Sequence, residues 1–169
     1  MRTLATTAAL AVLACATQAR AEQVTLRLEG VHADEDGKAI TAALSKAESV
    51  KVATSPTKDQ PVAVVAFDPA KVDVGELARL VAGAETPNRS KGAPSATLVL
   101  KYQRLDGSAA ADEVYLPKKV EEAFARLKGV DAKKCRLDTK TKELHIRLDD
   151  QGGARLADIK KGFPGLSLE

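Results

Sequence analysis

The sequence has no tryptophan, and phenylalanine and tyrosine together make up 3% of its 169 residues. Small aliphatic side chains must therefore fill the core, because few large rings are present to do so. Cysteine is as scarce, with Cys15 and Cys135 alone in the chain. We expect Cys15 to be removed with an N-terminal segment, and the single remaining thiol excludes an internal disulfide. Stability must then come from packing.

Sequence patterns for catalysis are also missing. The two histidines, His32 and His145, fall in different halves of the chain. There is no supported Ser/His/Asp set, no glycine-rich phosphate loop and no His-Glu-x-x-His pattern. Carboxylates are plentiful, but none lies in an obviously apolar stretch that would raise its pKa. The sequence therefore predicts a protein that is not an enzyme.

The first residues have the pattern of a secretory signal peptide. Met1-Arg2 gives a short positive start, Leu4 to Thr17 is apolar or small throughout, and Ala19-Arg20-Ala21 supplies a cleavage signal. We expect residues 1–21 to be removed and the protein to be periplasmic or secreted from a bacterium. The apolar run is too short to cross a bilayer, so no membrane span is expected.

A second interpretation of this segment stays open. Val12-Leu13-Ala14-Cys15 loosely resembles a bacterial lipoprotein box, which would place a lipid anchor on Cys15. Mass spectrometry of the mature N-terminus distinguishes a start at Glu22 from a lipidated Cys15.

Charge excludes one class of partner. The formal net charge is +3, but the predicted signal peptide contains Arg2 and Arg20 and no acid, so the rest is nearly balanced. Acids and bases are interspersed, as on an ordinary solvated surface. No basic footprint for nucleic acid follows, and we expect no nucleic-acid partner.

Hydrophobic periodicity predicts the same order of elements twice. Asp73 is the expected N-cap of the second helix and Gly83 its end. The first half contains, in chain order, a strand at 24–28, a helix at 39–47, strands at 50–54 and 62–67, and a helix at 74–82. The second half contains a strand at 96–102, a helix from Pro117, strands at 133–138 and 143–149, a helix around 156–163, and an edge strand at 166–168.

This repetition predicts an internal duplication with two units of about seventy residues each. We expect an α+β fold of two tandem ferredoxin-like (βαββαβ) sandwiches, the first without a clear last strand. The predicted boundaries are residues 22–86 for the first domain, 87–95 for a linker and 96–169 for the second, more divergent domain. The linker is predicted from its turn-forming residues, "AETPNRSKGAPS" at 84–95.

The stretches "VTLRLEG", "VAFDPAKVD" and "ELARLVAGA" resemble the heavy-metal-associated (HMA) domain family. This is the small fold of copper chaperones, of the periplasmic mercury-binding protein and of the metal-binding modules of P-type ATPases. The second half matches more weakly, through "VEEAFARLKGV" and "KKCRLDTKTKELHIRLDD". The resemblance implies a ferredoxin-like fold and heavy-metal handling.

The family's Met-x-Cys-x-x-Cys metal motif is absent from both halves. Val31 stands at the Met position, Ala33 at the first Cys and Asp36 at the second. Paired thiolates bind soft ions such as Cu(I), so that chemistry is not implied for this chain. The resemblance therefore implies a degenerate metal site, with weak or no transition-metal binding.

Other residues in the same loop are candidate metal ligands. His32, Asp34 and Asp36, with Glu35 between the two aspartates, could offer nitrogen and oxygen to a divalent transition metal such as Zn(II), Cu(II) or Ni(II). The simpler interpretation is that Asp34 or Asp36 caps the helix that follows, because acids at a helix start accept its free N–H groups and complement its dipole.

Three further features have structural and functional interpretations. Cys135 is expected to be a small buried side chain, with an exposed thiol as the alternative. His145 is expected to point outward on the uncovered face of the sheet, where a pH-sensitive contact is the alternative. The apolar strand Val62–Phe67 is either central in its sheet or docks another surface.

Two functions follow from the sequence. The first is an exported, non-enzymatic HMA-like protein of the heavy-metal-handling family. The alternative is a protein-interaction or scaffold module of the cell envelope that binds no metal, with a cell-envelope protein as its partner.

Overall fold

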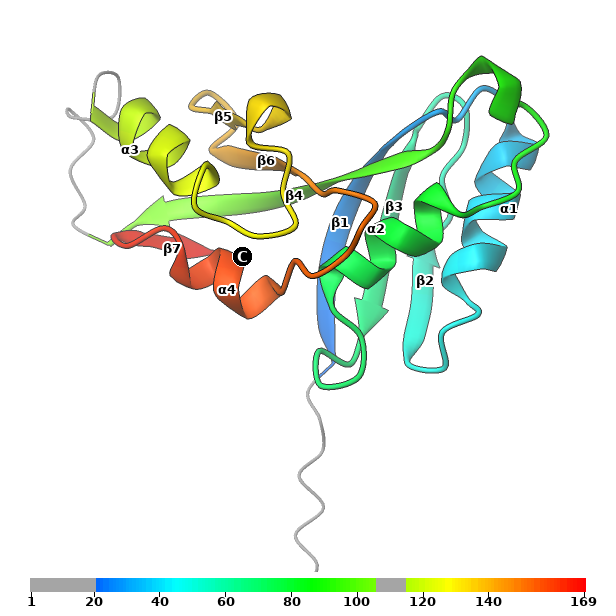
Figure 1. The fold of residues 1–169 in the computed structure, drawn as a ribbon, viewed down its shortest axis with the longest axis horizontal. Coiled ribbons are helices and arrows are strands. Elements are labelled where there is room, and N and C mark those ends of the chain that lie inside the picture. Colours follow the sequence, from blue (N-terminus) through cyan, green and yellow to red (C-terminus); the bar gives the residue numbers. More distant parts are fainter. Residues whose placement is uncertain (1–20, 106–114) are drawn as a thin grey trace, which may run out of the picture.

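The structure, a computed structural model, describes residues 21–105 and 115–169. The predicted signal peptide, apart from Ala21, and Cys15 lie outside these residues. Within them, no helix is long and apolar enough to cross a membrane. The fold is α+β, with one mainly antiparallel sheet and helices on one of its faces (Figure 1).

The elements alternate in the order expected from the sequence. The first half contains β1 (Glu22–Glu29), α1 (Asp34–Leu44), β2 (Val50–Thr54), β3 (Val62–Phe67), α2 (Val74–Ala82) and the 3-10 helix η1 (Arg89–Lys91). The second half contains β4 (Ser95–Arg104), α3 (Tyr115–Phe124), the 3-10 helix η2 (Ala132–Lys134), β5 (Arg136–Asp138), β6 (Glu143–Arg147), α4 (Leu156–Lys161) and β7 (Leu166–Leu168).

Each half has the strand order of a ferredoxin-like sandwich. In the first, the strands lie in the order β2-β3-β1-β4, and Leu26 of β1 faces Ala63 of β3 on one side and Leu98 of β4 on the other. In the second, β6 and β7 flank β4, with β5 outside β6. The predicted fold class is therefore confirmed, and the first unit does have a last strand.

That last strand is β4, which belongs to both units. Residues 95–99 pair with β1 along one edge, and residues 97–101 pair with β6 along the other. Beyond them Tyr102, Gln103 and Arg104 pair with β7. A ten-residue strand is about 34 Å long, enough for β1 and β7 to occupy successive parts of one edge. The units thus differ from the expected pair of separate sandwiches, because one strand serves both.

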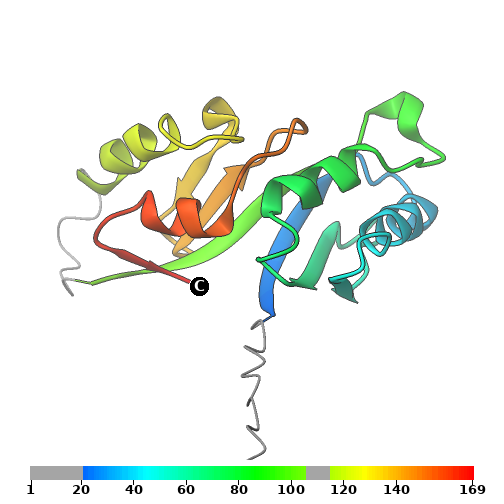
Figure 2. The ribbon, with the colours of Figure 1, turned by 60° about the horizontal axis from the view of Figure 1, so that its bottom comes forward.

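The hydrophobic core is continuous across the shared strand. Alternate residues of β4 are buried, and they join buried residues of both units in one cluster. All four α-helices lie on one side of the sheet (Figure 2), so this cluster lies between the helices and the sheet. In the second unit the rings of Phe124 and Phe163 pack edge to face, with centroids 5.4 Å apart.

The first turn of α2 also contacts the second unit. Gly75, at the start of α2, donates its backbone N–H to the carbonyl oxygen of Ala154, 2.9 Å away in the segment before α4. A side chain at Gly75 would lie 2.6 Å from the backbone nitrogens of Gly153 and Ala154. This approach requires glycine, and it holds α2 of the first unit against the segment before α4 of the second.

Several boundaries differ from the predictions. The helix predicted from Ala39 begins at Asp34, because the acids before it form its first turn. The strand predicted from Lys133 begins at Arg136, after the 3-10 helix η2. The predicted N-cap is confirmed, since Asp73 Oδ1 accepts the N–H of Glu76 at 2.7 Å, and Gly83 is the C-cap of α2.

Candidate functional site

The loop between β1 and α1 is the first candidate site, because the sequence resemblance places the metal motif of HMA domains at this position. Ala33 is the N-cap of α1, with an extended backbone, and Asp36 is the third residue of the helix. The Asp36 side chain is 0% exposed. A carboxylate so fully buried must have its oxygens satisfied by hydrogen bonds or by an ion.

Hydrogen bonds satisfy both oxygens of Asp36. Oδ2 accepts the backbone N–H groups of His32 and Ala33, each at 2.9 Å. Oδ1 accepts the backbone N–H of Asn88 at 3.1 Å, and the Asn88 side-chain amide reaches both oxygens. Asp36 thus caps its own helix and connects it to the segment before η1.

The charge of Asp36 is stabilised by these bonds. Burial alone would raise the pKa of this carboxyl, but the N–H donors of Asn88, His32 and Ala33 outweigh burial and hold its pKa below the ordinary value of 3.8. The capping interpretation of the sequence therefore describes Asp36. The part played by Asn88 carried no signal in the sequence beyond its place in a turn-rich segment.

Replacing Asp36 by asparagine is expected to lower the melting temperature by roughly 5–10 °C near neutral pH, since the new amide group would face N–H donors. Because folding lowers the pKa of Asp36, its carboxylate stabilises the folded state at pH values above the pKa that the group has in the unfolded chain. This stabilisation is lost as the pH falls through the pKa of the folded state. The difference from wild type should therefore shrink below pH 4 or so in thermal melts. Asp34→Asn is the control, because exposed Asp34 accepts, within the described residues, the N–H of Lys58 alone; an equal loss there would contradict this role.

The three predicted ligands differ in their surroundings. His32 and Asp34 are exposed, whereas Asp36 is buried. The His32 ring lies near Gly92: its Nε2 would be 3.9 Å from a Cβ atom placed on that glycine. Among the described residues, no three His, Cys, Asp or Glu side chains form a group that could hold a metal ion. The metal site of His32, Asp34 and Asp36 stays a prediction.

Cys135 lies just before β5 and is half-buried against the core. Its Sγ donates to the carbonyl of Asp131 and accepts the N–H of Arg147, both at 3.3 Å. Burial raises the pKa of the thiol to about 11. The thiolate, which is the nucleophile and the metal ligand, is therefore disfavoured at neutral pH.

His145 corrects one expectation. It alternates with buried Leu144 and Ile146, so it does lie on the uncovered face, but it is 5% exposed rather than at the surface. Its ring is flanked by Arg136 on β5 and Val99 on β4, and Nε2 lies 3.3 Å from the Glu143 carboxylate. Sequence alternation predicts the face of a strand residue but not how neighbouring strands enclose it.

Burial, followed by the charge of Arg136, lowers the pKa of His145 below 6.5, although Glu143 opposes the shift. A histidine that binds its proton less tightly when folded favours the unfolded state at low pH. Stability should therefore rise as the pH increases through the lowered pKa of the folded state towards 6.5, and His145→Gln should flatten this part of the profile in urea titrations. An unchanged slope in the variant would contradict the assignment; His32→Gln, at an exposed site, is the control.

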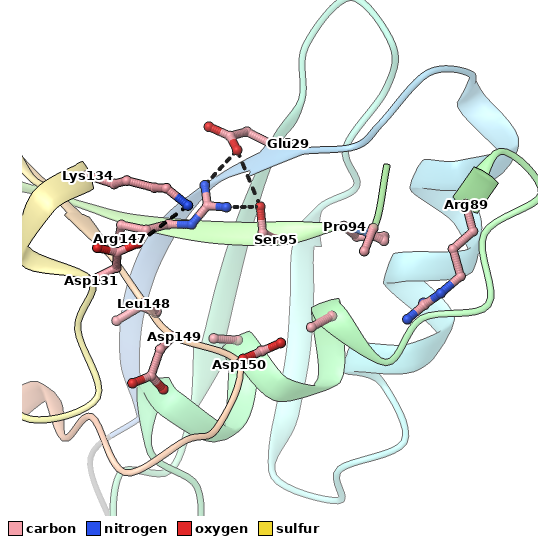
Figure 3. Close-up of a pocket in the computed structure, with 13 residues that line it drawn as sticks. Glu29, Arg89, Pro94, Ser95, Asp131, Lys134, Arg147, Leu148, Asp149 and Asp150 are labelled. Carbon is pink, nitrogen blue, oxygen red and sulfur yellow. Dashed lines mark hydrogen bonds and ion pairs between the residues drawn. The ribbon is translucent and has the colours of Figure 1, made fainter. Parts of the chain in front are cut away.

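A second candidate is a polar pocket of about 380 Å³ where the two units meet (Figure 3). The Arg147 guanidinium lies 2.7 Å from Glu29 Oε2 and also hydrogen-bonds the Ser95 hydroxyl. Beside Arg147, Lys134 pairs with Asp131 at 3.4 Å (Figure 3). These contacts link β1, β4 and β6, and the pocket lining also contains Arg89 and the acids Asp149 and Asp150. Because its cations are engaged in ion pairs and hydrogen bonds, of which those of Arg147 join the strands, the pocket has the features of a junction between units.

Comparisons with known proteins add a fold likeness. No protein-family model matches the chain, and no curated protein matches it. Two solved structures are similar over most of its length. The water-soluble region of the P-type ATPase CopA from Bacillus subtilis is 12% identical, with a TM-score of 0.38, covering 89% of this chain and 93% of that one. The N-terminal soluble domains of Bacillus subtilis CopA are 13% identical, with a TM-score of 0.39, covering 89% and 94%. At such low scores the fold assignment rests on strand order and pairing instead.

Proposed function

We propose that the protein is a non-enzymatic, exported binding protein of the heavy-metal-associated type, whose first loop no longer captures soft metal ions. The observation that supports this is the state of Asp36. It stands where the resemblance places the second cysteine, and four N–H groups of His32, Ala33 and Asn88 already occupy its oxygens. A metal ion at this position would have to replace these bonds and separate α1 from Asn88.

Calorimetric titration of the mature protein tests this proposal. Cu(I) should give no binding at submillimolar concentration, because no thiolate lies in the loop. Stoichiometric Cu(I) binding that resists a competing chelator would contradict the proposal. Titrations with Zn(II) and Cu(II) test the predicted divalent site at His32, Asp34 and Asp36. Only a heat of binding that disappears in His32→Ala would support that site.

A second candidate is a protein-interaction module of the cell envelope, and the uncovered face of the sheet favours it. Strand β3 is flanked by β2 and β1, so it lies inside the sheet. Its residues Ala63, Val65 and Phe67 are buried under the helices, whereas Val62, Val64 and Ala66 remain half-buried on the other face. Metal analysis of protein purified from its native cell envelope separates the candidates. A stoichiometric ion favours metal handling, and apo protein with a co-purifying partner favours interaction.

A further inference from the structure

The sheet has one face that no helix covers in the described part of the chain (Figure 2). We call it the open face, and it consists of the strand residues that alternate with the core. Its centre has small, half-buried side chains. Thr25 of β1 lies between Val64 of β3 and Val99 of β4 in register. The central residues are Thr25, Val62, Val64, Ala66, Thr97 and Val99.

Four exposed cations surround this centre. Arg27 lies between Val62 and Thr97, and Lys51 lies opposite Ala66. Lys101 lies opposite Glu143, and Arg136 opposite His145. None of the four cations is ion-paired with a carboxylate within the described residues.

Among its strand residues, the open face has three acids, Glu29, Asp138 and Glu143, and Glu29 is paired with a fifth cation of this face, Arg147. Glu143 contacts His145 Nε2 and accepts the hydroxyl of Thr141 at 3.2 Å. Asp138 accepts the backbone N–H groups of Lys140 and Thr141. These acids keep their charge, but the five cations of the strands outnumber them, so the open face has a net positive charge although the chain as a whole is nearly balanced. A surface of this kind attracts a negatively charged ligand.

We propose that the open face binds an acidic, extended segment of a partner protein, with its small apolar side chains on the central residues and its carboxylates at Arg27, Lys51, Lys101 and Arg136. Every second side chain of an extended segment points to the same side, so a segment whose contacting side chains are apolar in the middle and acidic towards the ends matches a flat face with an apolar centre and charged surroundings. This proposal rests on the second candidate function.

Two other classes of ligand fit the open face less well. Binding of single-stranded nucleic acid relies on aromatic side chains that stack on bases, and the described residues of this face contain none. Adsorption to a lipid surface relies on exposed large apolar side chains. Among the described residues only Leu105, at 72% exposure, is of that kind, and it lies after β4 and outside the face.

Fluorescence anisotropy of the mature protein with a short labelled peptide that has Glu residues at both ends and Val residues between them tests the proposal, in chelator and without added metal. The triple variant Arg27→Glu, Lys101→Glu, Arg136→Glu should weaken binding at least about tenfold. The matched control is Lys38→Glu, Lys46→Glu, Lys128→Glu, which reverses three exposed cations away from the open face. It has the same net charge and should bind almost as wild type.

Three outcomes would overturn the proposal: equal loss in both triple variants, no peptide binding by the wild type, or binding only to phosphatidylglycerol vesicles or single-stranded DNA. Circular dichroism checks that each variant is folded. Val64→Ser gives a second measurement, since it should weaken peptide binding without altering the salt dependence. Tight Cu(I) binding in the separate titration would refute the loss of metal capture and leave the peptide result unaffected.

Discussion

Replacing Leu98 by alanine is expected to destabilise both βαββαβ units at once, by about 3–5 kcal/mol. Leu98 is 0% exposed and lies at the middle of the shared strand, opposite Leu26 of the first unit and Ile146 of the second. The cavity that alanine leaves would be lined by side chains of both units. Because the core is continuous, neither unit should retain wild-type stability.

Hydrogen exchange measured during denaturation tests this expectation. Amides of β3 and of β6 report on the two units separately, and in Leu98→Ala both sets should lose protection to the same extent. Leu137→Ala is the matched control, because Leu137 is half-buried in β5, at the edge of the sheet; we expect a smaller, more local loss. Two distinct unfolding transitions, or wild-type protection in either unit, would contradict the view that β4 couples them.

Gly75→Ala is expected to destabilise the protein by about 1–3 kcal/mol, against the usual effect of this substitution in a helix. Alanine normally stabilises a helix by up to about 1 kcal/mol relative to glycine. Here the added carbon would lie 2.6 Å from two backbone nitrogens, of Gly153 and Ala154, and backbone cannot rotate away as a side chain can. The α2 helix would have to move from the other unit, which would also break the Gly75–Ala154 hydrogen bond.

Gly83→Ala is the control for this prediction. Gly83 ends the same helix with φ −79°, and its added carbon would come no closer than 3.2 Å to another atom. Chemical denaturation should show Gly83→Ala close to wild type and Gly75→Ala clearly weaker. Equal stabilities for the two variants would mean that the contact of α2 with the second unit does not depend on this close approach.

The periodicity of the sequence predicted most elements because it reports burial directly. Val24, Leu26 and Leu28 alternate with polar residues, and all three are buried in β1. Asp73 was recognisable as an N-cap from its chemistry and position alone. These signals are local, so each could be interpreted within a few residues of the chain.

The features that the sequence did not reveal depend on contacts between distant residues. The pattern of residues 96–102 identifies a strand but not that β1 and β6 both pair with it. The buried state of His145 likewise depends on β4 and β5, and the bonds of Asp36 depend on Asn88. For the loop before α1, the sequence therefore predicted a capping carboxylate but not that Asn88 would bind it. The metal-ion alternative stayed open at that stage.

Because both units share β4, the protein cannot be cut into two halves without exposing a strand edge. A fragment ending before residue 95 would leave Thr25 to Glu29 of β1 without a neighbour on one side. A fragment beginning at residue 95 would leave the corresponding edge of β4 bare up to Val99. Unpaired strand edges recruit other chains, so each half alone should self-associate when expressed. Either half would therefore need a replacement for this edge before it could exist as a single-unit protein.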